Sequence, residues 1–136
     1  NIQPAICCAQ LQRIGEIMQA KQRIFNSYSM ELSGSPVILN QPSSWATNAY
    51  WLMAARIKGL SEERSDALMT GLKEKGVDSR PFFYPMSSLP YLTDTADTPV
   101  SFEVFKEGIN LPTYVDLTDE DIHFVCETLL SVINDL

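Results

Sequence analysis

The chain has 136 residues, 45% of them hydrophobic and 20% charged, which is the composition of one globular domain with a sizeable core. Its formal net charge is −7, from 10 basic and 17 acidic side chains, which argues against a nucleic-acid backbone or an anionic membrane as the main partner. No apolar run reaches the length of about 20 residues that a membrane helix needs. Three cysteines, Cys7, Cys8 and Cys126, are too few and too unevenly spaced for a disulfide framework or a zinc site. We expect them to be buried free thiols in a reducing cytoplasm.

The N-terminal segment is predicted to form one long amphipathic helix. Asn1 is a suitable N-cap, and Pro4 is tolerated in a first helical turn. Apolar side chains then recur at steps of three and four residues. They are Ile6, Leu11, Ile14, Ile17, Met18, Ile24, Phe25, Tyr28 and Leu32. Gly34 and Pro36 end the helix. A helix of this length with a broad apolar face suggests a link between two bodies, and the opening on a cap residue instead of Met suggests a piece of a longer polypeptide.

Two extended segments and a helix are predicted next. Residues 37–39 form a short extended segment. Residues 48–57 are apolar on both faces, which indicates a strand covered on both sides. Ser61 caps a helix over residues 62–75, and Gly76 stands where a C-terminal glycine is typical.

The second half of the chain is also predicted to alternate between extended segments and helices. Residues 77–84 are extended, and residues 93–100 have the composition of a turn. A short helix over 101–108 and a brief strand and turn over 109–114 follow. Thr118 caps the last helix, whose first turn is acidic. The order of elements predicts an α+β fold, a small, mostly antiparallel sheet packed with helices.

Residues for self-contained catalysis are hard to find. His123, the single histidine, has no nucleophile or second histidine at motif spacing, and we expect a surface or half-buried helix residue. The acids at 119–121 are consecutive, so they face different ways and form a solvated helix start. The sequence contains no glycine-rich phosphate motif. We therefore predict no catalytic and no metal-binding residue in this chain.

The stretch "SRPFFYPMSSLPY" is the main candidate for a binding site. Arg80 precedes a proline, which favours an extended backbone and projects its side chain from a strand end. Phe82 and Tyr84 follow on a stiffened loop, and Ser87 and Ser88 offer hydroxyl groups. An arginine beside aromatic faces suits an anionic ligand with a planar or sugar part. The alternative is that the aromatic rings fill the core and Arg80 makes an internal salt bridge.

Three segments resemble the DegT/DnrJ/StrS family of pyridoxal-phosphate (PLP) sugar aminotransferases. They are "NIQPAICCAQLQRI", "ALMTGLKEKGVDSRPFFYPMSSLPYL" and "GINLPTYVDLTDEDIHFV", which occur in the family's order and spacing over nearly the whole chain. The second is closest to perosamine-synthase-like members, in which a Ser–Ser pair replaces a histidine. Pro4 and Cys7 depart from the pattern, since the family favours Ala and Gly there.

The resemblance implies a fold-type-I enzyme of which this chain is one part. Residues 1–35 would be the linking helix and residues 36–136 the C-terminal small domain, while the large domain that holds PLP would be absent from the chain. The full-length enzyme would be a homodimer that moves an amino group, typically from glutamate, to a nucleotide-linked keto-sugar. This chain alone would be inactive.

The resemblance also implies positions for the candidate residues. Arg80, Phe82, Tyr84, Ser87 and Ser88 would line the substrate mouth. Asn1 and Gln3 would lie near the cofactor end of the linking helix. Two alternatives stay open: a dehydratase of the same family, in which histidine replaces the catalytic lysine, and a free-standing α+β module for binding or dimerisation.

Overall fold

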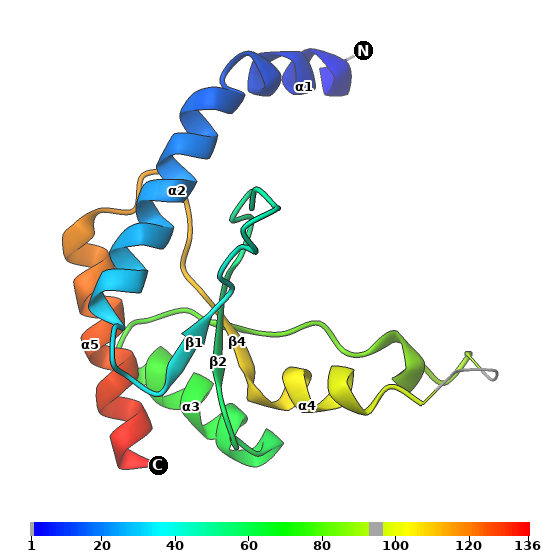
Figure 1. The fold of residues 1–136 in the computed structure, drawn as a ribbon, viewed down its shortest axis with the longest axis vertical. Coiled ribbons are helices and arrows are strands. Elements are labelled where there is room, and N and C mark those ends of the chain that lie inside the picture. Colours follow the sequence, from blue (N-terminus) through cyan, green and yellow to red (C-terminus); the bar gives the residue numbers. More distant parts are fainter. Residues whose placement is uncertain (1, 93–96) are drawn as a thin grey trace.

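The computed structural model describes residues 2–92 and 97–136, and its elements follow one another in the predicted order (Figure 1). They are α1 (Ile2–Gln12), α2 (Ile14–Glu31), β1 (Val37–Leu39), β2 (Met53–Ile57), α3 (Glu62–Glu74), β3 (Arg80–Pro81), the 3₁₀ turn η1 (Met86–Ser88), α4 (Pro99–Glu107), β4 (Gly108–Leu111) and α5 (Asp119–Asp135). The predicted α+β class is confirmed. The predicted turn at 93–100 lies partly outside the described residues, and α4 begins at Pro99, two residues before the expected start. Among the described helices, none is both long and apolar enough to span a bilayer.

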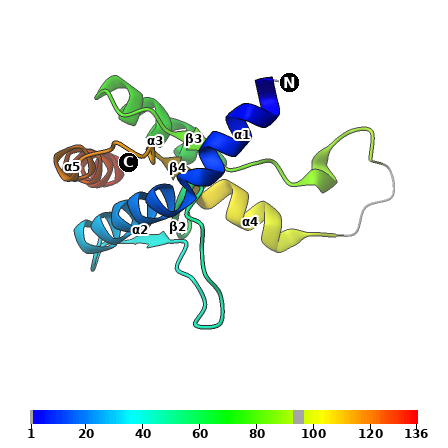
Figure 2. The ribbon, with the colours of Figure 1, turned by 90° about the horizontal axis from the view of Figure 1, so that it is seen from above.

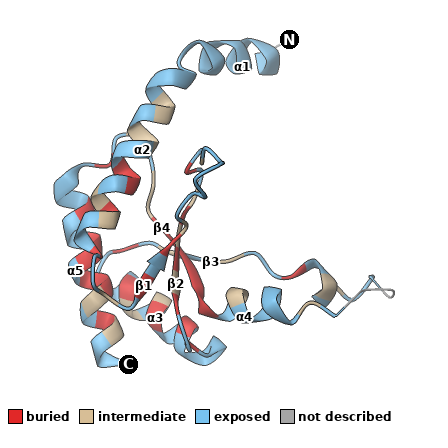
Figure 3. Ribbon diagram, viewed as in Figure 1, coloured by how far each residue is buried: buried red, intermediate tan, exposed pale blue. Residues whose placement is uncertain are grey.

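The prediction of one long N-terminal helix is wrong, because the helix breaks at Arg13. The Arg13 N–H donates to the Gln10 carbonyl at 3.0 Å, a turn tighter than α-helical bonding. Gly15, a poor helix former, follows two residues later. α1 therefore leaves α2 at a steep angle, away from the rest of the molecule (Figure 1). No described element covers α1, so all its described residues are exposed (Figure 3).

The sheet has four antiparallel strands in the order β1-β2-β4-β3. β2 is shorter than predicted, because only Met53–Ile57 of the 48–57 segment pairs with neighbours. Tyr50 has a φ of 48°, a left-handed conformation that a regular strand does not accept. The Asn48 Oδ1 accepts the Tyr50 N–H at 2.9 Å, which stabilises this turn in place of a strand ladder. The extended segment at 77–84 is likewise reduced to the two residues of β3.

The core lies between the sheet and helices α2, α3 and α5. α2 and α5 run side by side over the sheet in both views (Figures 1 and 2). The largest fully buried side chains come from all of these layers: Ile24, Tyr28, Met53, Leu68, Leu72, Ile109, Leu117, Ile122 and Leu129. The prediction that β2 is fully covered on both sides is only half right, because Ala54 and Arg56 on its second face are half-buried.

The predicted caps Ser61, Gly76 and Thr118 are confirmed, whereas the predicted cap Asn1 lies outside the described residues. Ser61 accepts the Arg64 N–H, and Gly76 follows α3 with a φ of 87°. Thr118 and Asp121 form a capping box at the start of α5. These signals lie within a few residues of each other, so the local sequence is enough to specify them.

The prediction of three buried thiols is right only for Cys126. Cys126 is 1% exposed on the inner face of α5, and its burial raises the pKa of the thiol to about 12. Cys7 and Cys8 are exposed because they lie on α1.

Candidate functional site

A cavity of about 870 Å³ opens between β3, the end of β4 and the start of α5. Its walls are mostly apolar and aromatic, with a few convergent polar groups, which is typical of ligand sites. Among its lining residues are Arg80, Phe82, Tyr84, Asn110, Tyr114 and Phe124. We call this cavity the main pocket.

The short strand β3 sets the position of the aromatic wall. Arg80 pairs with Asn110 and Pro81 with Ile109, and the Phe82 N–H donates to the Gly108 carbonyl at 3.4 Å. A Cβ atom on Gly108 would lie 2.1 Å from two carbons of the Phe82 ring. The missing side chain of Gly108 therefore allows the Phe82 ring to lie directly against the backbone of β4.

The structure brings three of the five predicted mouth residues into the main pocket: Arg80, Phe82 and Tyr84. Ser87 and Ser88 do not line it. The Ser87 Oγ is 2.6 Å from the Thr98 Oγ1, and the Ser88 Oγ donates to the Pro85 carbonyl at 2.7 Å, so both hydroxyls stabilise the loop.

Of the two residues expected near the cofactor, only Gln3 is described, and it does not line this pocket. Gln3 is exposed on α1. Asn1 lies outside the described residues.

Arg80 is the only cationic residue among those that line the main pocket in the described chain. Its guanidinium is 3.0 Å from the Asp78 carboxylate, and both side chains are largely exposed, at 75% and 72%. An exposed pair of this kind contributes little to stability. The salt bridge is therefore exposed and not internal, as the alternative required, and it leaves most of the guanidinium accessible to an anion.

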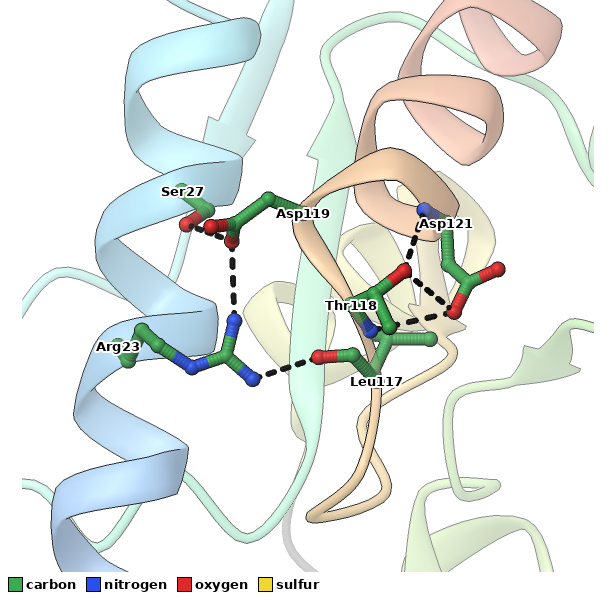
Figure 4. Close-up of polar contacts among 6 residues, drawn as sticks. All are labelled: Arg23, Ser27, Leu117, Thr118, Asp119 and Asp121. Carbon is green, nitrogen blue, oxygen red and sulfur yellow. Dashed lines mark hydrogen bonds and ion pairs between the residues drawn. The ribbon is translucent and has the colours of Figure 1, made fainter.

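Two side chains of α2 hold the far wall of the main pocket by donating to main-chain carbonyls of the connection between β4 and α5. The buried Tyr28 hydroxyl donates to the Pro112 carbonyl at 3.0 Å. Arg23 donates to the Leu117 carbonyl at 2.6 Å and to Asp119 at 2.9 Å (Figure 4). Pro112 and Leu117 line the pocket, so α2 fixes the wall from behind.

Lys21 makes the third contact of this kind. Its ammonium group donates to the Thr113 carbonyl, to the Thr113 hydroxyl at 3.2 Å and to the Trp51 carbonyl at 3.5 Å. Partial burial lowers the pKa of Lys21. Lys21 thus ties α2 both to the segment before β2 and to the connection between β4 and α5.

The sequence reasoning missed several residues of the site. Asn110 is a polar residue on the buried strand β4, beside Leu111 and Pro112. A polar residue within an apolar strand could have indicated a binding role from the sequence. Tyr114 and Phe124 come from the β4–α5 connection and from α5. They are distant in sequence from the aromatic loop, so no local pattern could have grouped them with it.

His123 is exposed on α5, as predicted, and it does not line the main pocket although Phe124 and Val125 do. Its Nδ1 is 3.0 Å from a Glu31 carboxylate oxygen, and its Nε2 is 3.5 Å from one of Glu127. No group of three His, Cys, Asp or Glu side chains within residues 2–92 and 97–136 could hold a metal ion.

The described residues do not fit covalent binding of PLP. A Schiff base requires a lysine amine at the site, and no lysine lines the main pocket in the described part of the chain. Lys21, the one partly buried lysine with a lowered pKa, is directed at carbonyl oxygens. No step through this cofactor follows from these residues alone.

The fold is shared with aminotransferases of known structure. An aminotransferase of Helicobacter pylori (PseC) involved in the biosynthesis of pseudoaminic acid superposes with a TM-score of 0.89 at 16% identity, over 99% of this chain and 38% of that chain. A candidate sugar aminotransferase from Streptococcus pneumoniae, in its PLP form, superposes with a TM-score of 0.86 at 22% identity, over 94% of this chain and 34% of that chain.

The sequence identifies the family. The chain belongs to the DegT/DnrJ/EryC1/StrS aminotransferase family, whose model matches residues 1–130. It is 34% identical to a GDP-perosamine synthase of Vibrio cholerae over 137 residues, which are 98% of this chain and 37% of that protein. It is 33% identical to a GDP-perosamine synthase of Caulobacter vibrioides, with the same coverage of 98% and 37%. The chain therefore spans little more than a third of the length of these relatives.

Proposed function

We propose that this chain is the C-terminal small-domain part of an enzyme that moves an amino group, from glutamate as donor, to a nucleotide-linked keto-sugar. Residues 1–35 form the link to the rest of the enzyme and residues 36–136 form the small domain. Support comes from the family match and from relatives named GDP-perosamine synthase. A sugar linked to guanosine diphosphate is accordingly the first substrate to test.

The main pocket forms one wall of the substrate site in this proposal. The observation that carries it is the position of Arg80, the one cation among the described residues that line a mostly apolar and aromatic cavity. A guanidinium group donates several hydrogen bonds in a fixed plane and therefore suits phosphate oxygens. Phe82 and Tyr84 offer flat faces for the sugar or base of the same ligand.

PLP is held by another part of the full-length protein. When bound, it acts as the electron sink that makes amino transfer possible. Support comes from related folds solved in PLP and PMP forms. Because the main pocket has no lysine among its described lining residues, this chain alone is inactive.

The remaining assignments extend the same proposal. Asn1 and Gln3 belong to the cofactor end of the link, and the full-length enzyme is a cytoplasmic homodimer. Ser87 and Ser88 form the outer rim of the substrate mouth by shaping the loop, since their hydroxyls bond to Thr98 and Pro85.

The test is the Arg80→Ala substitution in the full-length enzyme. We expect the KM for the nucleotide-linked keto-sugar to rise about tenfold or more, because a charge-assisted contact to phosphate is lost. The absorbance of bound PLP and the KM for glutamate stay unchanged. Arg64→Ala, which removes an exposed arginine of α3 outside the pocket, is the matched control. An unaltered sugar-nucleotide KM in Arg80→Ala would contradict the role of Arg80.

A further inference from the structure

We propose that a shallow depression beside the main pocket is a nucleobase subsite, with Trp51 and Phe83 as the stacking surface and Asn110 as the hydrogen-bond acceptor. The depression has a volume of about 370 Å³. It shares Leu52, Phe82, Phe83 and Asn110 with the main pocket, so the two cavities adjoin each other. The inference rests on the proposed function, because that function supplies a ligand with a base at one end.

Trp51 and Phe83 provide the flat apolar surface. The side chains come from the segment before β2 and from the segment after β3, and their ring centroids are 6.4 Å apart with an interplanar angle of 23°. Trp51 is 70% exposed and Phe83 is 76% exposed, so the described residues leave most of both rings uncovered. Exposed aromatic rings next to a cavity are the usual platforms on which bases stack.

Asn110 supplies the hydrogen-bond acceptor of the subsite. It is only 8% exposed, and its Nδ2 donates to the Pro81 carbonyl at 3.0 Å. A carbonyl only accepts hydrogen bonds, so the atom that faces it must be the amide nitrogen and the oxygen is turned elsewhere. No hydrogen bond from a described residue reaches the Asn110 Oδ1. This oxygen is not fully buried, so a ligand in the depression can reach it with an N–H group.

The other two asparagines that line the depression, Asn40 and Asn48, offer no accessible acceptor. The Asn40 Nδ2 donates to the Leu52 carbonyl at 3.3 Å, and its buried Oδ1 has no partner among the described residues. Both ends of the Asn48 amide are engaged, with the Asn40 carbonyl and with the Tyr50 N–H. Asn48 therefore holds the loop and the Asn40 oxygen is closed off, so Asn110 supplies the accessible acceptor of the subsite.

Charge separates the two cavities. None of the residues that line the depression is ionisable: Asn40, Asn48, Trp51, Leu52, Ala54, Phe82, Phe83 and Asn110. The main pocket contains the cation Arg80 together with the carboxyl groups of Asp78 and Asp121. A neutral flat ring with N–H donors is therefore favoured in the depression, and the phosphates of the same ligand are favoured beside Arg80. A purine that carries an amino group is both a neutral flat ring and an N–H donor.

The experiment compares ligands with and without a base on the full-length enzyme loaded with PLP. Calorimetric titration with GDP and with inorganic pyrophosphate separates the contribution of the base from that of the phosphates. We expect Trp51→Leu to weaken GDP binding about tenfold, which corresponds to about 1.4 kcal/mol, and to leave pyrophosphate binding unchanged. Phe83→Leu should likewise weaken GDP binding and leave pyrophosphate binding unchanged. Trp45→Leu, which removes another exposed indole that does not line the depression, leaves both affinities unchanged.

Two results would overturn the subsite. One is GDP binding in Trp51→Leu equal to that of the wild type, and the other is an equal loss of GDP and pyrophosphate affinity. Binding of a free hexose that Trp51→Leu abolishes, with GDP unaffected, would reassign the depression to a sugar. Failure of the proposed function looks different, because the wild-type enzyme would then bind neither GDP nor the keto-sugar nucleotide.

Discussion

The ring of Phe82 lies against the backbone of Gly108, so close that a methyl group on that glycine would overlap two ring carbons at 2.1 Å. Gly108 has φ −108° and ψ 136°, an extended conformation open to any residue. The glycine is therefore required for space and not for backbone freedom.

Gly108→Ala should displace the Phe82 ring and lower the free energy of unfolding by about 1–3 kcal/mol, as overpacking typically does. Gly15→Ala is the matched control, because nothing lies within 4 Å of its added Cβ and alanine favours the helix. Gly15→Ala should stabilise by up to about 1 kcal/mol. Urea denaturation of both variants gives the comparison, and a neutral Gly108→Ala would contradict the contact.

Tyr28→Phe should lower the free energy of unfolding by about 1 kcal/mol, because the Pro112 carbonyl loses its hydrogen bond from the fully buried hydroxyl. Tyr50→Phe is the control, since the Tyr50 hydroxyl only accepts a long hydrogen bond, at 3.5 Å, from the exposed Gln22 amide. Equal unfolding energies in urea for the two variants would show that the Tyr28 hydroxyl does not hold the pocket wall.

Glu107→Gln should lower the melting temperature at pH 7 more than Glu103→Gln does, although both carboxylates contact Arg56. Glu107 is 6% exposed and accepts the Gly59 N–H at 2.6 Å, which together with Arg56 lowers the pKa of the Glu107 carboxyl. A lowered pKa means that this stabilisation is present above about pH 4.3 and is lost as the pH falls through the folded-state value. In calorimetric scans from pH 3 to 7, the melting temperatures of the two variants should converge at the lowest pH.

His123 should contribute a pH dependence of the opposite sign. Its hydrogen bond with Glu31, with the charge of Glu127 in support, raises the pKa of His123 above 6.5. This stabilisation is complete below about pH 6.5 and is lost as the pH rises through the folded-state pKa. The difference in urea midpoint between wild type and His123→Gln should be largest near pH 6 and small at pH 9. Glu31→Gln should reduce that difference, and a constant difference across this range would contradict the pair.

Two of the three thiols of the 136-residue chain should react rapidly with a disulfide reagent such as DTNB. Cys7 and Cys8 are exposed on α1, whereas Cys126 is buried and its thiol has a pKa of about 12. The third equivalent should appear only in denaturant. The double variant Cys7→Ser, Cys8→Ser should show almost no rapid phase, and three fast thiols in the wild type would contradict the burial of Cys126.

The sequence alone determined the features that depend on neighbouring residues. Ser61, Gly76 and Thr118 mark helix ends correctly, because a cap involves only the adjacent turn of backbone. The family was also evident from three motifs in their proper order, and the family match confirms it. Arg80, Phe82 and Tyr84 could be grouped because they follow one another on one strand end.

Only the tertiary structure decided the rest. The segment before Met53 has strand-forming residues, yet contacts of Asn48 and Tyr50 turn it into a loop. The N-terminal helix breaks at Arg13, and no described element covers α1 beyond the break. Ser87 and Ser88 are close in sequence to Arg80 but bond to other parts of the loop, while Asn110 and Tyr114 reach the main pocket from another segment. Local pattern specifies which elements form, because it depends on backbone preference. The pairing of distant segments depends on how the elements pack, so the makeup of the pocket becomes visible only in three dimensions.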